Sequence, residues 1–382
     1  MRSQFYFPIE RAKAGEFSAS GALAPRTKGV MCPIFDLPRA ETFREFALLQ
    51  STVASTLART WGTAHELYLD LFRYDPDLLT PAGDPYVALL FNSARQVRLK
   101  AIPVIGPLLE RRGTSGAYIR GVAGIAERDG RGAAIRIPFA DLSQAERLNA
   151  VIDEIQGAIG VKDSDCDVFL DAGPADSLPG GLPAAATLLR QTLLHAAQTV
   201  SRRQFRTLIL CGSSIPRSPR KRADGAPIRI ANLEFQAWSE VLNSKEYRHV
   251  RFGDYGARYA NQSDKKQKAR APARIQLATP EHHVLYIGAS ESYRALARKA
   301  ADSPEFGAQH GVWGKHAVRD SANGRGGVGT PTDWVARDAH MHIESMVRAV
   351  ESRLGEVSPS IAVDTTGKAE PHGQIDLLIS QN

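Results

Sequence analysis

Short apolar runs recur along the first two-thirds of the chain. Eight runs can be distinguished, at residues 5–9, 30–37, 66–71, 101–105, 133–138, 167–171, 207–211 and 250–254. They are apolar almost throughout instead of alternating, which is typical of strands buried on both faces. Helical spacing of apolar residues lies between several of them, at residues 39–61, 141–160 and 183–203. The pattern therefore predicts strands that alternate with helices.

Strands that alternate with helices pair in parallel through right-handed crossovers. Eight such units in about 255 residues match the usual size of a closed β/α barrel. We therefore predict an eight-stranded (β/α)8 barrel of the TIM type over residues 1–256. An open, doubly wound α/β sheet is the alternative fold that the same pattern allows.

The pattern changes after the eighth run, where residues 256–273 are polar and basic. Four elements are predicted beyond this segment: strands of a hairpin at 275–278 and 284–287, and helices at about 290–302 and 333–354. They predict a C-terminal α+β appendage of a hairpin and helices over residues 257–354. The tail, residues 355–382, is rich in Pro, Ser, Thr and Gly, and we expect it to be loosely packed.

The composition is that of a soluble globular protein, with 43% apolar and 23% charged residues in 382. No apolar run is long enough to predict a membrane span, and the N-terminus lacks the apolar stretch of a signal peptide. Cys32, Cys166 and Cys211 lie far apart and form no metal-ligand spacing. We expect three buried free thiols in a protein of the reducing cytoplasm.

Carboxylates stand at the ends of several predicted strands, where barrels carry their functional groups. The candidates for catalytic acid and base are Glu10, Asp70, Asp171 and Asp254. Asp36 and Asp171 are candidates for binding a divalent metal, Mg²⁺ or Mn²⁺, because both ions prefer oxygen ligands. In the alternative interpretation, each aspartate only caps a following helix or turn.

The loops after the seventh and eighth predicted strands are basic, in a chain whose net charge is +7. Barrels often bind phosphate at these two loops, where serine and arginine supply donors. Candidate ligand-binding residues are Lys13, Ser213, Ser214, Arg217, Arg220, Arg274 and Tyr286. We therefore expect an anionic ligand or nucleic acid at the mouth, with solvated basic loops as the alternative.

Other catalytic and nucleotide-binding motifs are not found in the sequence. The Gly-rich segment 323–330 lacks the GK[ST] of a P-loop and follows no predicted strand. His340 and His342 are two residues apart, whereas a two-histidine metal site on a helix needs a spacing of four. No Gly-x-Ser-x-Gly elbow is present, which gives no support to an esterase or a protease.

Several stretches taken together resemble one known family. They are Phe7-Pro8-Ile9, Lys13-Ala14-Gly15-Glu16-Phe17, Pro33-Ile34-Phe35-Asp36-Leu37-Pro38, Gly253-Asp254-Tyr255, Ala273-Arg274-Ile275, Tyr286-Ile287-Gly288, Ser303-Pro304-Glu305-Phe306, Trp313-Gly314, 327–334 and His342-Ile343. Over about residues 5–350 the chain resembles the phage beta protein family, and the C-terminal matches, with Trp313, Trp334 and His342, are the most specific. The chain departs from the family pattern at Asp36, Ile287 and Met341, where the family has Glu, Arg and His.

The resemblance implies a phage or mobile-element protein in the cytoplasm of a bacterial host. Two functions remain open. The first is a metal-assisted hydrolase of a phosphoester or nucleic-acid-derived ligand. The second is a non-catalytic module in phage defence or anti-defence, which binds an anion, a nucleic acid or a protein partner. The enzyme requires carboxylates that converge in space, whereas the binding module requires only the basic surface.

Overall fold

The structure is a computed structural model. It describes residues 4–107, 115–175, 181–217, 219, 225–243, 245–257, 272–288, 293–307, 312–325 and 327–355. The predicted tail from residue 356 onward lies outside this part. No helix among the described residues is both long and apolar enough to cross a membrane.

Eight parallel strands form the larger sheet, in the order β1-β2-β3-β4-β5-β6-β7-β9. Their bounds are β1 Ile9–Arg11, β2 Ile34–Asp36, β3 Glu66–Asp70, β4 Lys100–Ile105, β5 Ala133–Pro138, β6 Cys166–Pro174, β7 Thr207–Ser213 and β9 Arg251–Asp254. The first and last strands meet, because the Phe7 N–H donates to the Phe252 carbonyl at 2.9 Å and Tyr6 bridges to Phe252. The predicted (β/α)8 barrel is therefore confirmed, and the open sheet is not.

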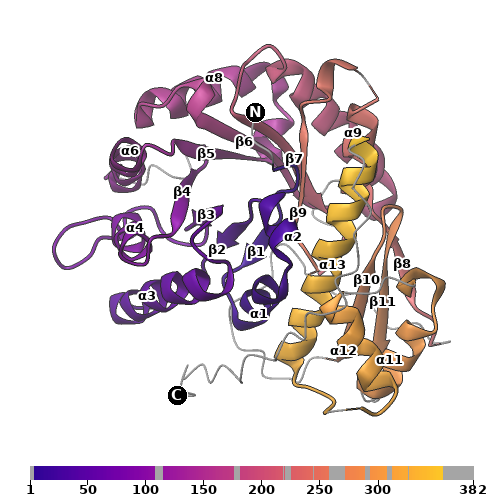
Figure 1. The fold of residues 1–382 in the computed structure, drawn as a ribbon. Coiled ribbons are helices and arrows are strands. Elements are labelled where there is room, and N and C mark those ends of the chain that lie inside the picture. Colours follow the sequence, from indigo (N-terminus) through magenta and orange to yellow (C-terminus); the bar gives the residue numbers. More distant parts are fainter. Residues whose placement is uncertain are drawn as a thin grey trace.

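Helices surround the strands (Figure 1). Those of the barrel are α1 Ala14–Ala22, α2 Pro25–Gly29, α3 Phe43–Thr60, α4 Tyr86–Gln96, α6 Ala117–Asp129, α7 Phe139–Leu142, α8 Ala145–Ile159, α9 Gly181–Val200, α10 Leu233–Val241 and α13 Pro331–Leu354. Apolar side chains on the outer faces of the strands pack against these helices in one continuous core. The place of the helix after β9 in the ring is taken by α13, which follows α11 and α12 in the chain, and α13 contacts α1, which closes the ring of helices.

The barrel interior is filled by side chains that alternate with the outward ones. They are Phe7, Ile9, Cys32, Ile34, Tyr68, Ile102, Val104, Ala134, Phe169, Ile209, Cys211 and Tyr255. All three cysteines are buried free thiols, as predicted. The interior is thus a packed core, and ligand chemistry is confined to its two ends.

The appendage is a small antiparallel sheet in the order β10-β11-β8 with two helices. Its bounds are β8 Ile228–Ala231, β10 Ala273–Ala278, β11 His282–Gly288, α11 Tyr293–Ala301 and α12 Trp313–Ala322. The hairpin β10–β11 was predicted, whereas β8 and α12 were not. β8 comes from the connection between β7 and β9, so the small sheet joins segments on both sides of residue 256.

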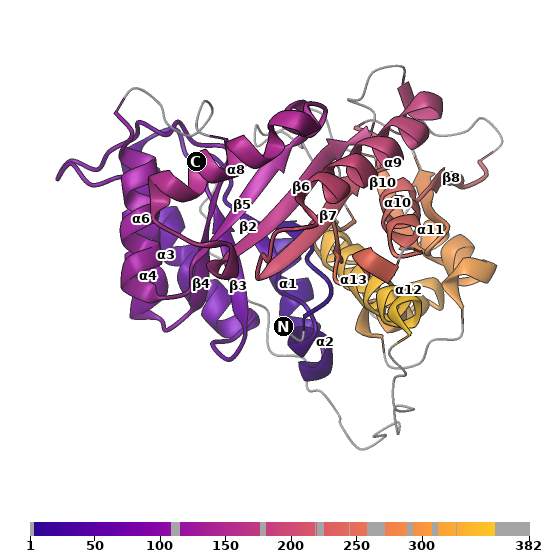
Figure 2. The ribbon, with the colours of Figure 1, turned by 90° about the horizontal axis from the view of Figure 1, so that it is seen from above.

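Helix α13 lies between the barrel and the small sheet, as both views show (Figures 1 and 2). Ile343, Met346 and Val350 belong to the barrel core, whereas Trp334 and Met341 belong to the core of the appendage. A capping box starts the helix, in which Thr330 and Asp333 satisfy each other's backbone N–H groups. One helix is therefore shared by the two hydrophobic cores.

Candidate functional site

Among the charged residues at inward positions at the C-terminal ends of the barrel strands, which include Arg11, four form one cluster. Asp36, Asp70 and Asp171 each stand two residues beyond an interior side chain, Ile34, Tyr68 and Phe169. Side chains two apart on a strand point to the same face. The fourth residue, Arg136, follows Ala134 in the same way. The strand geometry therefore directs three carboxylates and one guanidinium into the same space.

The guanidinium of Arg136 lies among the three carboxylates. Its Nη1 donates to Asp36 Oδ1 at 3.1 Å and to Asp70 Oδ2 at 2.8 Å, and its Nε donates to Asp171 Oδ2 at 2.8 Å. All four side chains are at least nine-tenths buried. Asp36, Asp70 and Asp171 thus converge in space, with a cation at their centre.

Burial and charge set the protonation of this cluster. Burial alone would lower the pKa of Arg136, but Tyr255 and the three aspartates raise it well above its ordinary value. Burial raises the pKa of Asp36, and the charge of Arg136 opposes that shift only in part. Asp36 therefore holds its proton more readily than an exposed aspartate, which is a property of acid–base groups.

Two aromatic side chains flank the guanidinium. The Tyr255 hydroxyl donates to Asp171 Oδ2 at 2.5 Å and accepts from Arg136 Nη2 at 2.7 Å. Burial raises the pKa of Tyr255 well above its ordinary value, so the hydroxyl stays protonated. Phe72 lies with its ring centre 5.0 Å from Arg136 Cζ and is 42% exposed. The cluster thus has a buried side at Tyr255 and a solvent-facing side at Phe72.

The cluster does not fit a divalent metal. Among the described residues, no group of three or more His, Cys, Asp or Glu is arranged to hold an ion. Asp36 and Asp171, the predicted ligands, both direct a carboxylate oxygen at Arg136. A bound cation would have to displace this guanidinium, which already neutralises the carboxylates.

Asp254 lies outside this cluster, although it ends a barrel strand. Its neighbours Gly253 and Tyr255 point inward, so Asp254 points outward toward α13. Its carboxylate accepts from the Tyr6 hydroxyl at 2.8 Å and lies 2.8 Å from His342 Nε2. Burial would raise the pKa of Asp254, but the charge and hydrogen bond of His342 hold it below its ordinary value. Asp254 is therefore the buried partner of His342 and does not contact the Arg136 cluster through these bonds.

A second buried pair lies against the first. His283 Nε2 is 3.2 Å from Glu234 Oε1, and Glu234 also accepts from the Ser214 hydroxyl. The rings of His283 and His342 stack, with centroids 5.8 Å apart and an angle of 16° between them. The two histidine–carboxylate pairs join β9, β11, α10 and α13, so they connect the appendage to the barrel.

The other predicted residues take several positions. Glu10 is buried beside Gly256, and Lys13 occupies the N-cap position of α1 without a side-chain cap hydrogen bond. The Ser213 hydroxyl accepts from the Ile215 N–H at 3.3 Å, while Arg217 is exposed beyond β7. Arg220 lies outside the described residues. The phosphate-binding set therefore stays a prediction.

The C-terminal candidates belong to the appendage. Arg274 donates to the Ala257 carbonyl at 3.1 Å, and Tyr286 is buried in the appendage core. Trp334 is fully buried and stacks on Tyr293 with ring centroids 4.7 Å apart. Trp313 is partly exposed beside His340. Arg274, Tyr286 and Trp334 therefore make structural contacts in the appendage, whereas Trp313 is exposed. His342, the remaining C-terminal candidate, is the partner of Asp254.

Arg136, Glu234 and His283 are the residues that the sequence analysis missed. Arg136 was visible as a charge inside an apolar run, two positions after Ala134, where alternation already places it inside the barrel. Glu234 and His283 gave no comparable signal, because they lie in α10 and β11, which are far apart in the sequence.

One comparison with known proteins found a match along most of the chain. The model of the family described as Beta protein matches residues 6–348, which include the whole barrel apart from its first residues and nearly all of the appendage. A search of curated proteins found no match to the chain.

Proposed function

The chain belongs to the Beta protein family, and from this premise we propose that it is an enzyme whose active site is the Arg136 cluster at the mouth of the barrel. The proposed reaction is hydrolysis of an anionic, phosphate-bearing ligand. The observation that carries the proposal is the convergence of Asp36, Asp70 and Asp171 on one guanidinium. A binding module has no need of buried carboxylates brought together in this way.

Asp36 is the proposed general acid. Its raised pKa keeps a proton available at a higher pH than an ordinary aspartate does. Asp171 is the proposed base, positioned by the Tyr255 hydroxyl and the Gly173 N–H. In this mechanism a proton moves from Asp36 to the leaving oxygen while Asp171 accepts a proton from the attacking water.

Arg136 is proposed to bind the ligand anion and to stabilise the charge that develops in the transition state. Its four hydrogen bonds to the cluster use four of the five guanidinium N–H groups. The fifth, on Nη2, is the proposed donor to a phosphate oxygen. The proposal contains no metal step, because Arg136 occupies the position that a metal would need.

The wider context is also a proposal. The family points to a phage or mobile-element protein that acts in the cytoplasm of a bacterial host, in defence or anti-defence. In that setting, nucleotides and nucleic acids are the proposed source of the phosphoester. If no phosphoester is cleaved, the favoured function is that of a non-catalytic module that binds a protein partner.

The test is hydrolysis of a phosphomonoester, a phosphodiester and short DNA and RNA by the purified chain, with and without EDTA. We expect activity that survives EDTA, falls at least about a hundredfold in Asp36→Asn, and decreases as pH rises through the Asp36 pKa. Asp320→Asn is the matched control, because Asp320 is exposed on α12. Activity that depends on a metal, or that is equal in both variants, would contradict the proposal.

A further inference from the structure

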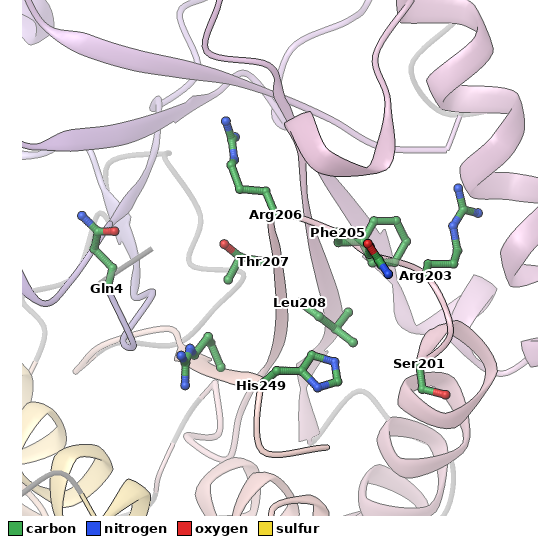
Figure 3. A pocket seen from close by; sticks show the side chains of 10 residues that line it. Gln4, Ser201, Arg203, Phe205, Arg206, Thr207, Leu208 and His249 are labelled. Atoms are coloured by element: carbon green, nitrogen blue, oxygen red, sulfur yellow. The ribbon is translucent and has the colours of Figure 1, made fainter. Parts of the chain in front are cut away.

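A cavity opens at the end of the barrel opposite the Arg136 cluster. It lies at the N-terminal ends of β7 and β9 and has a volume of about 290 Å³. Figure 3 shows Gln4 on one side of it, Thr207 and Leu208 on β7, and Phe205, Arg203 and Ser201 on the other side. This size is at the lower end of the range of small-molecule sites, about 300–1,000 Å³.

The lining of the cavity is basic. Arg203, Arg206, Arg251 and His249 are among its ten lining residues, and none of the ten is acidic. Arg206 is fixed by Asp167, with Nη2 to Oδ2 at 2.6 Å, and Arg203 is fixed by Asp163 at 2.7 Å. These two ion pairs fix Arg203 and Arg206 at the rim of the cavity, while Arg251 adds positive charge and His249 adds an imidazole ring to its lining.

The hydroxyl of Thr207 could form a hydrogen bond with a ligand in the cavity. The residue is 94% buried, and its Oγ1 has no hydrogen-bond partner among the described residues. An unsatisfied buried hydroxyl carries a free-energy cost that a bound acceptor removes. The ring of Phe205, with Arg203 Cζ 5.0 Å from its centre, adds a flat apolar surface beside these donors.

We propose that this cavity binds a small phosphomonoester. Its phosphate is held by Arg251 and the Thr207 hydroxyl, and its organic part extends toward His249 and Phe205. The charge and the donors of the lining match a tetrahedral oxyanion, and the volume excludes a polymer chain. The site is separate from the proposed active site and does not depend on it.

The test is isothermal titration with ribose 5-phosphate, with ribose as the uncharged comparison. We expect ribose 5-phosphate to bind and ribose not to bind. Thr207→Val, which keeps the shape of the side chain, should weaken binding about tenfold, and His249→Ala should weaken it as well. His249 is exposed, so its replacement leaves folding intact. Thr52→Val, on the surface of α3, is the matched control.

Mouth variants separate this site from the proposed active site. Because a phosphomonoester can also bind at the proposed active site, binding to the cavity is identified as the part that Thr207→Val and His249→Ala weaken and Asp36→Asn retains. Binding that is lost in Asp36→Asn and retained in Thr207→Val and His249→Ala would place the phosphate at the mouth and overturn the proposal. An absence of binding at millimolar ribose 5-phosphate would overturn it too, and it would leave the test of hydrolysis untouched.

Discussion

At the scale of single residues, the buried guanidinium of Arg136 determines the charge at the mouth of the barrel. Three aspartates without it would be buried anions, which are costly unless paired and hydrogen-bonded. With it, each carboxylate has a charged donor within 3.1 Å. The cluster is therefore as much a condition of folding as a candidate for catalysis.

Arg136→Met should remove this compensation while keeping most of the side-chain volume. We expect the free energy of unfolding, measured by urea denaturation, to fall by about 3–5 kcal/mol. Arg190→Met is the control, because Arg190 and Glu240 form an exposed pair, and it should cost less than about 1 kcal/mol. Adding Asp36→Asn to Arg136→Met should restore part of the loss. A double variant no more stable than the single one would contradict this account.

Asp254 should make stability depend on pH at the acidic end. Its pKa is lower in the folded protein than in the unfolded chain, so its contribution is present above the unfolded value and is lost as pH falls through the folded one. The difference in unfolding free energy between the wild type and Asp254→Asn should be largest at neutral pH and should decrease as the pH falls below about 4, the ordinary pKa of aspartate. A difference that is constant with pH would contradict the Asp254–His342 ion pair.

The residues of the Arg136 cluster can be found from the sequence because side chains alternate between the two faces of a strand. Asp36, Asp70 and Asp171 could be predicted because each ends a buried run on the same face as the residue two before it. Asp254 was a catalytic candidate because it also ends a run, but its neighbour Tyr255 lies in the barrel interior, so Asp254 lies on the outer face. The histidine pairs depend on contacts between distant elements, which no local pattern contains.

At the scale of elements, the contact between α1 and α13 requires a residue without a side chain. A Cβ on Gly15 would lie 2.5 Å from Val335 Cγ1 and 3.2 Å from the Thr332 carbonyl oxygen. The eight barrel strands could be predicted from apolar runs, and the long helices from their spacing. β8 could not be predicted, because its side chains are half-buried or exposed and its strand partner, β11, is distant in the sequence.

Gly15→Ala should force α1 away from α13. We expect a loss of about 1–3 kcal/mol in the free energy of unfolding, as is usual for overpacking. Gly157→Ala in α8 is the matched control, since nothing lies within 4 Å of its Cβ position. That control should gain about 0.5–1 kcal/mol from helix propensity. Equal effects of the two substitutions would argue against close packing at Gly15.

At the scale of the whole molecule, the barrel and the appendage are interleaved. The barrel needs α13, which follows the appendage in the chain, and the small sheet needs β8, which precedes β9. The boundary at residue 256 predicted from the sequence reflects a change of composition, and the contacts of α13 and β8 cross it. We infer that the two parts unfold together.

A chain that ends at residue 256 should therefore fail to fold. It lacks the helix that covers α1, and it leaves the apolar partners of Ile343, Met346 and Val350 in water. Near-UV circular dichroism should show no fixed tertiary structure for residues 1–256 and a native spectrum for residues 1–355. A native spectrum for the shorter chain would show that the barrel folds without α13.

The position of α13 also bears on how the protein is made. Translation delivers residues in order, and domains usually begin to fold from the N-terminal side as they emerge. Here α13, the helix that covers α1, leaves the ribosome after all eight barrel strands. The nascent barrel must therefore wait with an exposed apolar surface, which makes it a natural client for chaperones that shield such surfaces until α13 has emerged.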